Sequence, residues 1–177
     1  MDFPKSVVDL MKPGDIIQIH IPGKWFPWNM YYWSHTLMYV GDNNLVHSGV
    51  VQENIYTYFD KHTDIDNFTV LRVKGVTAGT LTKVVVWTKA QIGKPFDMWS
   101  LYRLTKQIDP PSDHPGYGFY CTELIWAAYF SQANIDLDKN HIGWINPMEI
   151  YMNTQVSLVY IKDKWAVPLP WKRLWLW

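Results

Sequence analysis

Alternating apolar and polar residues predict short β-strands along the chain. Isoleucine stands at positions 16, 17, 19 and 21, with Gln18 and His20 interleaved, and Pro22-Gly23 ends this first strand. Residues 34–40 and 45–48 make two more strand-like runs around a turn-forming sequence, Gly-Asp-Asn-Asn. Residues 69–74 and 156–160 have the character of further strands, and residues 165–170 that of an extended stretch. The pattern therefore predicts several strands, two of them joined in a hairpin.

Two segments show the spacing of a helix. After irregular residues at 110–118, apolar residues recur every three or four positions from Cys121 onward, so this helix should begin at the cysteine. Residues 81–92 are ambiguous. Three successive valines there favour a strand, whereas the apolar periodicity and the glycine that follows favour a helix.

The predicted hairpin carries two histidines, His35 and His47, and its register decides whether they meet. A three-residue loop over 41–43 would set Leu37 opposite His47, and His35 would then be a diagonal neighbour of His47 on the same face. A two-residue loop would put the two imidazoles on opposite faces. A joint chemical role for the histidines therefore requires the odd loop.

Cys121 is the only cysteine, and its predicted place at a helix N-terminus suits a nucleophile. Unpaired amides and the helix dipole there favour a thiolate and can hold an oxyanion. A thiol with a base and an orienting group is a recognised nucleophilic arrangement. Two alternatives stay open: a buried structural cysteine with structural histidines, and a zinc site, which lacks a fourth ligand at the usual spacing.

Five short motifs occur along the chain in an order similar to that of the circularly permuted papain-like amidases, the YiiX/YebB-like branch of the NlpC-type cell-wall hydrolase superfamily. These motifs are Pro13-Gly14-Asp15-Ile16-Ile17, His35-Thr36-Leu37-Met38-Tyr39-Val40-Gly41, Gly93-Lys94-Pro95-Phe96-Asp97, Tyr120-Cys121-Thr122-Glu123-Leu124 and Asn146-Pro147. The resemblance implies a circularly permuted papain-like α+β fold, a small antiparallel sheet packed with helices. It also favours a helix over 81–92.

The resemblance further implies Cys121 as nucleophile, His35 as the base that takes the thiol proton and His47 as the residue that orients His35. A histidine at the third position is similar to the related lecithin:retinol acyltransferase group, which acts on lipid acyl esters. The cysteine motif, with Glu123 two residues after the thiol, instead resembles the bacterial amidase-like branch. We therefore expect a cysteine hydrolase of cell-wall peptide amides that needs no cofactor and no metal. The alternatives are a lipid acyltransferase or acyl-ester hydrolase at a membrane interface, and a non-catalytic binding module.

Three further residues are candidates for supporting roles. Glu123 should serve as a structural carboxylate or support the nucleophile region by hydrogen bonding. Asp97 can serve packing, capping or catalysis, and the hydroxyl of Tyr120 can lie near an oxyanion.

The amino-acid composition narrows the range of binding partners more than it narrows the range of reactions. The 177 residues are 48% hydrophobic, which is enough for a core, and we expect a single domain over residues 1–177. Sixteen basic and sixteen acidic residues cancel, so nucleic acid is an unsuitable partner. The first ten residues lack the pattern of a signal peptide, and no stretch has the length of a membrane span. Localisation and oligomeric state stay open, since an exported chain without its signal peptide would look the same.

Eleven tryptophans are an unusual number and cluster in two places. Trp25, Trp28 and Trp33 precede His35, and we expect them to line the entrance of a substrate cleft, against the alternative of simple packing. The last seven residues, 171–177, mix two cations with apolar rings. They could contact a membrane surface or dock on the domain.

Overall fold

The computed structural model describes residues 2–23, 32–49, 51–103, 105–106, 118–138, 140 and 143–167. They form six helices and six strands, in the order α1 (Lys5–Val8), β1 (Ile16–His20), β2 (His35–Gly41), β3 (Asn44–His47), β4 (Val51–Asn54), α2 (Ile55–Lys61), β5 (Asn67–Val73), α3 (Ala78–Ala90), α4 (Met98–Arg103), α5 (Cys121–Ala133), α6 (Pro147–Tyr151) and β6 (Val156–Ile161). Within these residues, no helix has the length and apolar character needed to cross a membrane.

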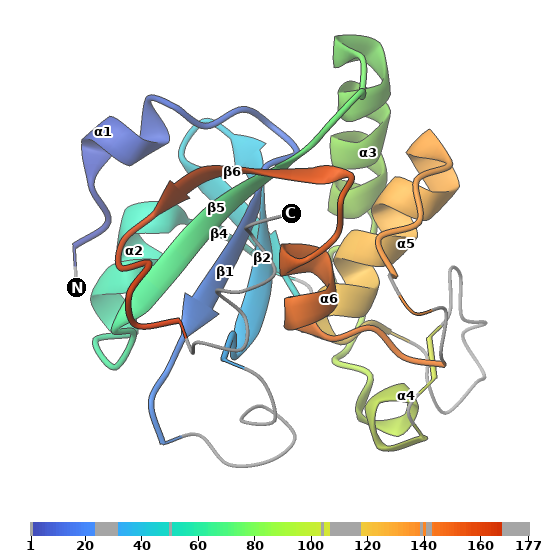
Figure 1. Cartoon of the computed structure of the whole chain (residues 1–177). Coiled ribbons are helices and arrows are strands. Elements are labelled where there is room, and N and C mark those ends of the chain that lie inside the picture. Colours follow the sequence, from blue (N-terminus) through green and yellow to red (C-terminus); the bar gives the residue numbers. More distant parts are fainter. Residues whose placement is uncertain are drawn as a thin grey trace.

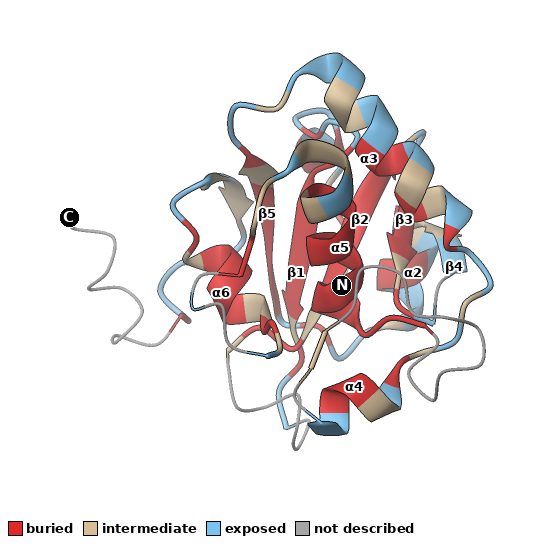
Figure 2. Ribbon diagram, turned by 90° about the vertical axis from the view of Figure 1, so that its right-hand side faces the viewer, coloured by how far each residue is buried: buried red, intermediate tan, exposed pale blue. Residues whose placement is uncertain are grey.

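One antiparallel sheet organises the molecule. Its strands lie in the spatial order β4-β3-β2-β1-β5-β6, and each neighbouring pair is antiparallel. Helices α1 and α2 lie on one side of this sheet, and α3, α5 and α6 lie on the other (Figure 1). The helix that begins with Cys121 runs across the sheet beside α3 (Figure 2). The fold is therefore α+β, as expected.

The two faces of the sheet bury separate apolar clusters. Alternate residues along each strand point to opposite faces, so Ile17 and Ile19 pack with Phe59 of α2, whereas Ile16 packs with Leu124 of α5. The cluster that contains Ile16 and Leu124 also contains residues of α3 and α6. The sheet is thus covered on both sides, which explains why its central strands are buried over nearly their whole length (Figure 2).

The hairpin between β2 and β3 differs from the prediction in its loop but has the predicted register. Its turn has two residues, Asp42 and Asn43, both with positive φ, and Gly41 faces Asn44. The three-residue loop was therefore wrong. A bulge between Tyr39 and Gly41 inserts one extra residue into β2 and shifts the register by one. As a result, Leu37 lies opposite His47, as the odd loop would have placed it.

Most other predicted elements are present. Strands β1, β5 and β6 cover most of the predicted segments, residues 81–92 are largely helical in α3, and α5 begins at Cys121. The extended stretch at 165–170 was wrong over its described part, because residues 164–166 form a turn in which Asp163 accepts hydrogen bonds from the amides of Trp165 and Ala166. The rest of that stretch, from 168, lies outside the described residues.

Candidate active site

A cavity of about 230 Å³ opens where β1 ends, β2 begins and β3 ends. Three imidazoles, a phenol and a hydroxyl contribute to its wall, together with two apolar side chains. The described lining residues are Ile21, Ser34, His35, His47, Tyr58, His62 and Phe96. The hydroxyl of Ser34 accepts a hydrogen bond from the Ile21 amide over 3.0 Å, which joins the ends of β1 and β2 beneath this cavity.

The two predicted histidines come together in the cavity wall. His35 pairs with Ile19 of β1, two residues before Leu37, which pairs with His47. Their rings lie with centroids 5.6 Å apart at an interplanar angle of 84°. The diagonal cross-strand placement expected from the register is therefore confirmed.

His47 is held in its neutral form. Burial lowers the pKa of the imidazole, and the nearby His62 lowers it further, while Glu53 and a hydrogen bond with the Ser48 backbone act in the opposite direction. The Nε2 atom of His47 is buried and forms no hydrogen bond with any of the described residues. A neutral ring with an unpaired Nε2 is suited to accept a hydrogen bond from a neighbouring N–H group.

Cys121 lies beside the histidine strand and is buried. Helix α5 packs against the sheet, and hydrogen bonding links the thiol of its first residue to the backbone of Thr36, the neighbour of His35. The thiol also contributes to the raised pKa of Tyr58, which lines the cavity. Cys121 is only 4% exposed and is not among the described lining residues.

The expected thiolate is not the resting form of this cysteine. Burial raises the pKa of Cys121 to about 11, although hydrogen bonds from the Thr36 and Thr122 backbones, the Thr122 side chain and its own backbone favour the thiolate. The helix N-terminus thus acts in the predicted direction, but the loss of hydration outweighs it. Burial thus opposes the thiolate that the position at the helix N-terminus favours.

Close backbone packing fixes the start of α5. Gly118 has φ +144°, and a Cβ atom at this position would lie 2.1 Å from the carbonyl oxygen of Pro95. The same oxygen accepts a hydrogen bond from the Phe119 amide over 3.2 Å. The motif around Pro95 therefore sets the position of the residues that lead into Cys121.

The three supporting candidates have structural partners. Glu123 is fully buried, and its carboxylate accepts a hydrogen bond from the Tyr120 amide over 3.1 Å, so it caps α5. The Tyr120 hydroxyl donates to the Thr105 carbonyl and accepts from the Ile145 amide, both over 3.1 Å. Asp97 caps α4 by accepting a hydrogen bond from the Ser100 amide over 2.8 Å, while its other carboxylate oxygen is buried and has no hydrogen-bond partner in the part of the chain that the structure describes. Because the Tyr120 hydroxyl is already engaged, its expected place near an oxyanion is not supported.

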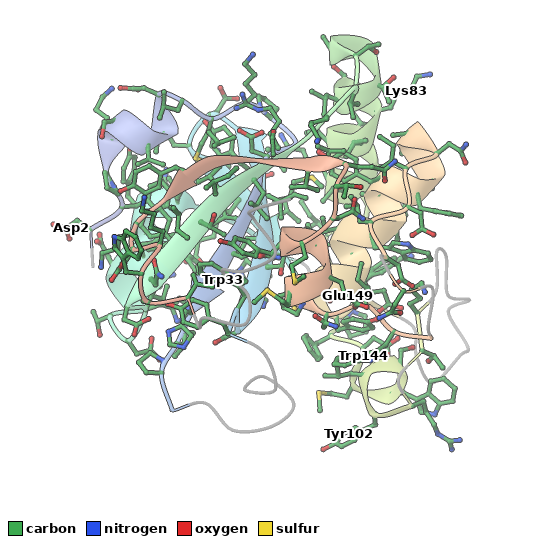
Figure 3. All side chains as sticks on the ribbon, in the orientation of Figure 1. Asp2, Trp33, Lys83, Tyr102, Trp144 and Glu149 are labelled. Carbon is green, nitrogen blue, oxygen red and sulfur yellow. The ribbon has the colours of Figure 1, made fainter. Side chains whose placement is uncertain are left out.

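The predicted aromatic cleft wall is not formed by Trp33. This side chain is fully buried among the rings of Tyr32 and Tyr151, and it lies inside the molecule (Figure 3). Packing, the alternative interpretation, therefore describes Trp33 better, since its large apolar ring stabilises the core between β2 and α6. Trp25 and Trp28 lie outside the described residues, as does the tryptophan-rich segment 171–177.

Sequence reasoning missed the contribution of α2 to the cavity. Tyr58 packs between two histidine rings, with centroids 5.2 Å from His47 and 4.5 Å from His62. The spacing of Tyr58 and His62, four residues apart, is that of neighbours on one helix face and could have indicated a shared surface. Nothing in the local sequence indicated that α2 would cover the end of β3.

The comparisons with known proteins support the fold. No protein-family model matches the chain, and no curated protein matches its sequence. Among solved structures, the chain is similar to YiiX of Escherichia coli O157:H7, which is described as a metalloprotein, with a TM-score of 0.63 over 84% of this chain and 96% of that chain. Within the described residues of this chain, no group of three His, Cys, Asp or Glu side chains could hold a metal ion. At 17% sequence identity, the likeness shows a shared YiiX-like fold.

Proposed function

We propose that the protein is a cysteine-dependent hydrolase that works through an acyl-enzyme on a circularly permuted papain-like fold. Cys121 is the nucleophile, His35 the base and His47 the residue that orients the base. The substrate bond is an amide of cell-wall peptide type.

One observation carries this proposal. His35 and His47 share one face of the sheet and line the same cavity, while hydrogen bonding links the Cys121 thiol to the backbone of the residue after His35. The histidines precede the cysteine in the chain, as the permuted arrangement requires. A base, an orienting group and a thiol in one region match the requirements of nucleophilic catalysis.

The reaction follows from these groups. His35 takes the thiol proton as the sulfur attacks the carbonyl carbon, and the amide of Cys121 donates to the developing oxyanion. His35 then gives the proton to the leaving amine, which leaves a thioester on Cys121. Water, deprotonated by His35, attacks the thioester, and the acid product leaves while the proton returns to the sulfur.

The neutral state of His47 suits its proposed role. When His35 becomes positively charged, a neutral His47 can accept a hydrogen bond from it through the unpaired Nε2. A positively charged His47 would instead repel the positively charged His35. Burial of His47 therefore supports a base at His35 rather than at His47.

The size of the cavity favours a small group over a lipid chain. Its volume, about 230 Å³, is below the roughly 300–1,000 Å³ that is usual for ligand pockets. An amino-acid residue of a peptide suits such a space better than a long acyl chain. The acyl-ester alternative is tested separately, by measuring the release of acid from short-chain and long-chain esters.

The test is the release of amines from a library of cell-wall peptides and simple peptide amides. We expect Cys121→Ala to abolish release and His35→Gln to reduce it by about 100-fold or more, which is the usual contribution of a general base. His20→Gln is the matched control, because His20 lies on the sheet outside the cavity and is paired with Asp66. Undiminished turnover by Cys121→Ala would refute a cysteine mechanism.

A non-catalytic binding module is the second candidate, and the burial of Cys121 favours it. A thiol that is 4% exposed, with a pKa of about 11, resembles an inert buried cysteine. The two functions predict different events once a peptide is bound. In the hydrolase, His35 takes the proton from a thiol that is neutral at rest, and the peptide is cleaved. A binding module would retain a peptide unchanged, and its affinity would be insensitive to Cys121→Ala.

A further inference from the structure

Three polar side chains are buried between the sheet and α6 without a hydrogen-bond partner among the described residues. The unpaired atoms are the amide oxygen of Gln18, the hydroxyl of Thr36 and the indole N–H of Trp33, and the three residues have no exposed surface. Buried polar groups of folded proteins are nearly always hydrogen-bonded, because burial has removed their contact with solvent. Three such groups in one region therefore indicate that a molecule other than the chain completes their hydrogen bonds.

The register of the sheet brings Gln18 and Thr36 together. Gln18 of β1 lies directly opposite Thr36 of β2, and the Cβ atoms of such a pair are about 4.5–5.5 Å apart on one face. That face also carries Ile16 and Met38, which belong to the apolar cluster under α5 and α6. The Nε2 atom of Gln18 donates to the carbonyl oxygen of Pro147, the first residue of α6, over 2.6 Å. Because a carbonyl only accepts, this bond commits Nε2 to α6 and leaves Oε1 as the unpaired acceptor.

Trp33 contacts the same helix from inside the molecule (Figure 3). The centroid of its ring system lies 5.3 Å from that of Tyr151, the last residue of α6. Tyr151 follows Pro147 by four residues, and residues four apart lie on the same face of a helix, one turn from each other. Trp33 and Gln18 therefore meet one face of α6 at neighbouring points, and the three unpaired groups surround one space between β1, β2 and α6.

The chemistry of these groups is that of a site for water. The indole N–H of Trp33 only donates a hydrogen bond, the amide oxygen of Gln18 only accepts one, and the hydroxyl of Thr36 does either. None of the three carries a charge that would hold an ion. A water molecule can accept from Trp33, donate to Gln18 and bond with Thr36 in either direction, and buried waters typically make about three hydrogen bonds.

We propose that Gln18, Thr36 and Trp33 bind one internal water molecule between β1, β2 and α6. This water connects α6 to the strand beside the proposed nucleophile, because the backbone of Thr36 is hydrogen-bonded with the thiol of Cys121. None of the three side chains is among the described residues that line the histidine cavity. The water site is therefore separate from the substrate cavity, and it does not depend on the proposed reaction.

The test detects water at Trp33 by NMR spectroscopy of the whole chain. We expect the indole N–H proton to show cross-relaxation with water, with the sign of a long-lived bound molecule, and Trp33→Phe identifies its signal among those of the eleven tryptophans. Gln18→Met and Thr36→Val should each abolish the cross-relaxation, because each removes one partner of the water. Thr69→Val is the matched control and should keep it. Thr69 also lies opposite Gln18, but its hydroxyl already donates to the Tyr160 carbonyl over 2.8 Å.

Absence of cross-relaxation in the wild type would overturn the proposal, as would a signal that survives Gln18→Met. If such a signal is lost only in Thr36→Val, it comes from proton exchange of the Thr36 hydroxyl. A high-resolution crystal structure of the wild type decides the matter if a variant does not fold. Density for one water within hydrogen-bond distance of all three side chains would support the proposal, and a chain segment in that space would contradict it. Neither measurement involves the release of amines, so its result is separate from the test of the proposed function.

Discussion

Two opposing effects act on the pKa of the Cys121 thiol. Its amide and that of Thr122 stabilise a negative sulfur, but complete burial raises the pKa of the thiol to about 11. A thiolate needs hydration or a cation, and the helix N-terminus alone replaces only part of that hydration. The resting protein should therefore hold a neutral thiol, and in the proposed mechanism the base acts during the reaction rather than before it.

Alkylation by iodoacetamide tests this ionisation directly. We expect the rate at Cys121 to rise only above about pH 9, because a pKa near 11 leaves about 100-fold less thiolate at pH 8 than the ordinary value of 9. The control is Val86→Cys in a Cys121→Ala chain, since Val86 is 61% exposed. Rapid alkylation of Cys121 below pH 8 would show that a cation stabilises the thiolate in the resting protein.

His47 should make the fold sensitive to mild acid. Its pKa in the folded state is lowered from 6.5, so below about pH 6.5 the unfolded chain binds more protons at this site than the folded chain does. The free energy of unfolding therefore falls as the pH falls through 6.5 towards the lower pKa of the folded state. Thermal melts between pH 7.5 and 5 should show a smaller loss of stability for His47→Gln than for the wild type. Parallel curves would mean that His47 titrates alike in both states.

At the scale of an element, the position of α5 depends on the close approach of Gly118, which has no side chain, to the backbone of Pro95. Gly118→Ala should destabilise the protein by more than about 2 kcal/mol, because the new Cβ would meet the Pro95 carbonyl oxygen, 2.1 Å away, at φ +144°. Gly79→Ala in α3 is the matched control, since a Cβ there meets nothing within 4 Å. It should be neutral or stabilising by about 0.5–1 kcal/mol. Urea denaturation measures both, and equal effects would show that the contact with Pro95 can relax.

The hairpin shows what alternation can and cannot predict about an element. The face shared by His35 and His47 was predicted on the condition of a three-residue loop, and the observed register does place Leu37 opposite His47. The predicted loop length was wrong, because a two-residue turn with a bulge gives the same strand register as a three-residue loop. Side-chain pattern thus constrains the pairing of strands more strongly than it constrains the turn.

Residues that meet only through the tertiary fold were the hardest to predict. Tyr58 and His62 reach the cavity because α2 packs over the end of β3, and no local pattern encodes that packing. Trp33 looked like a cleft residue because it stands two residues before His35, yet it faces Tyr151, more than a hundred residues away. Cys121 could be placed at a helix start from its sequence, but its burial depends on β2 and on the Pro95 segment.

The whole molecule is held together by a sheet with a core on each face. The cavity lies at one end of this sheet, where side chains from strands, α2 and the Pro95 segment meet. Arg72 of β5 adds a further tie, because its guanidinium forms two hydrogen bonds, of 2.8 and 2.6 Å, with the buried carboxylate of Asp15, which precedes β1. Loss of either core would expose the same strands, so we expect the two faces to unfold together.

This shared sheet predicts a single cooperative unfolding transition, as expected for one domain. Phe59→Ala removes a buried ring from the cluster under α2, and Leu124→Ala removes a buried side chain from the cluster under α5. Each should lower the free energy of unfolding by about 2–5 kcal/mol, and far-ultraviolet and near-ultraviolet circular dichroism should report the same midpoint in each variant. If the two signals instead have different midpoints in one variant, so that secondary structure persists after aromatic packing is lost, the two cores unfold separately. Because the cavity wall includes Tyr58 of α2 and Phe96 of the Pro95 segment, the first of the two transitions would then remove part of that wall.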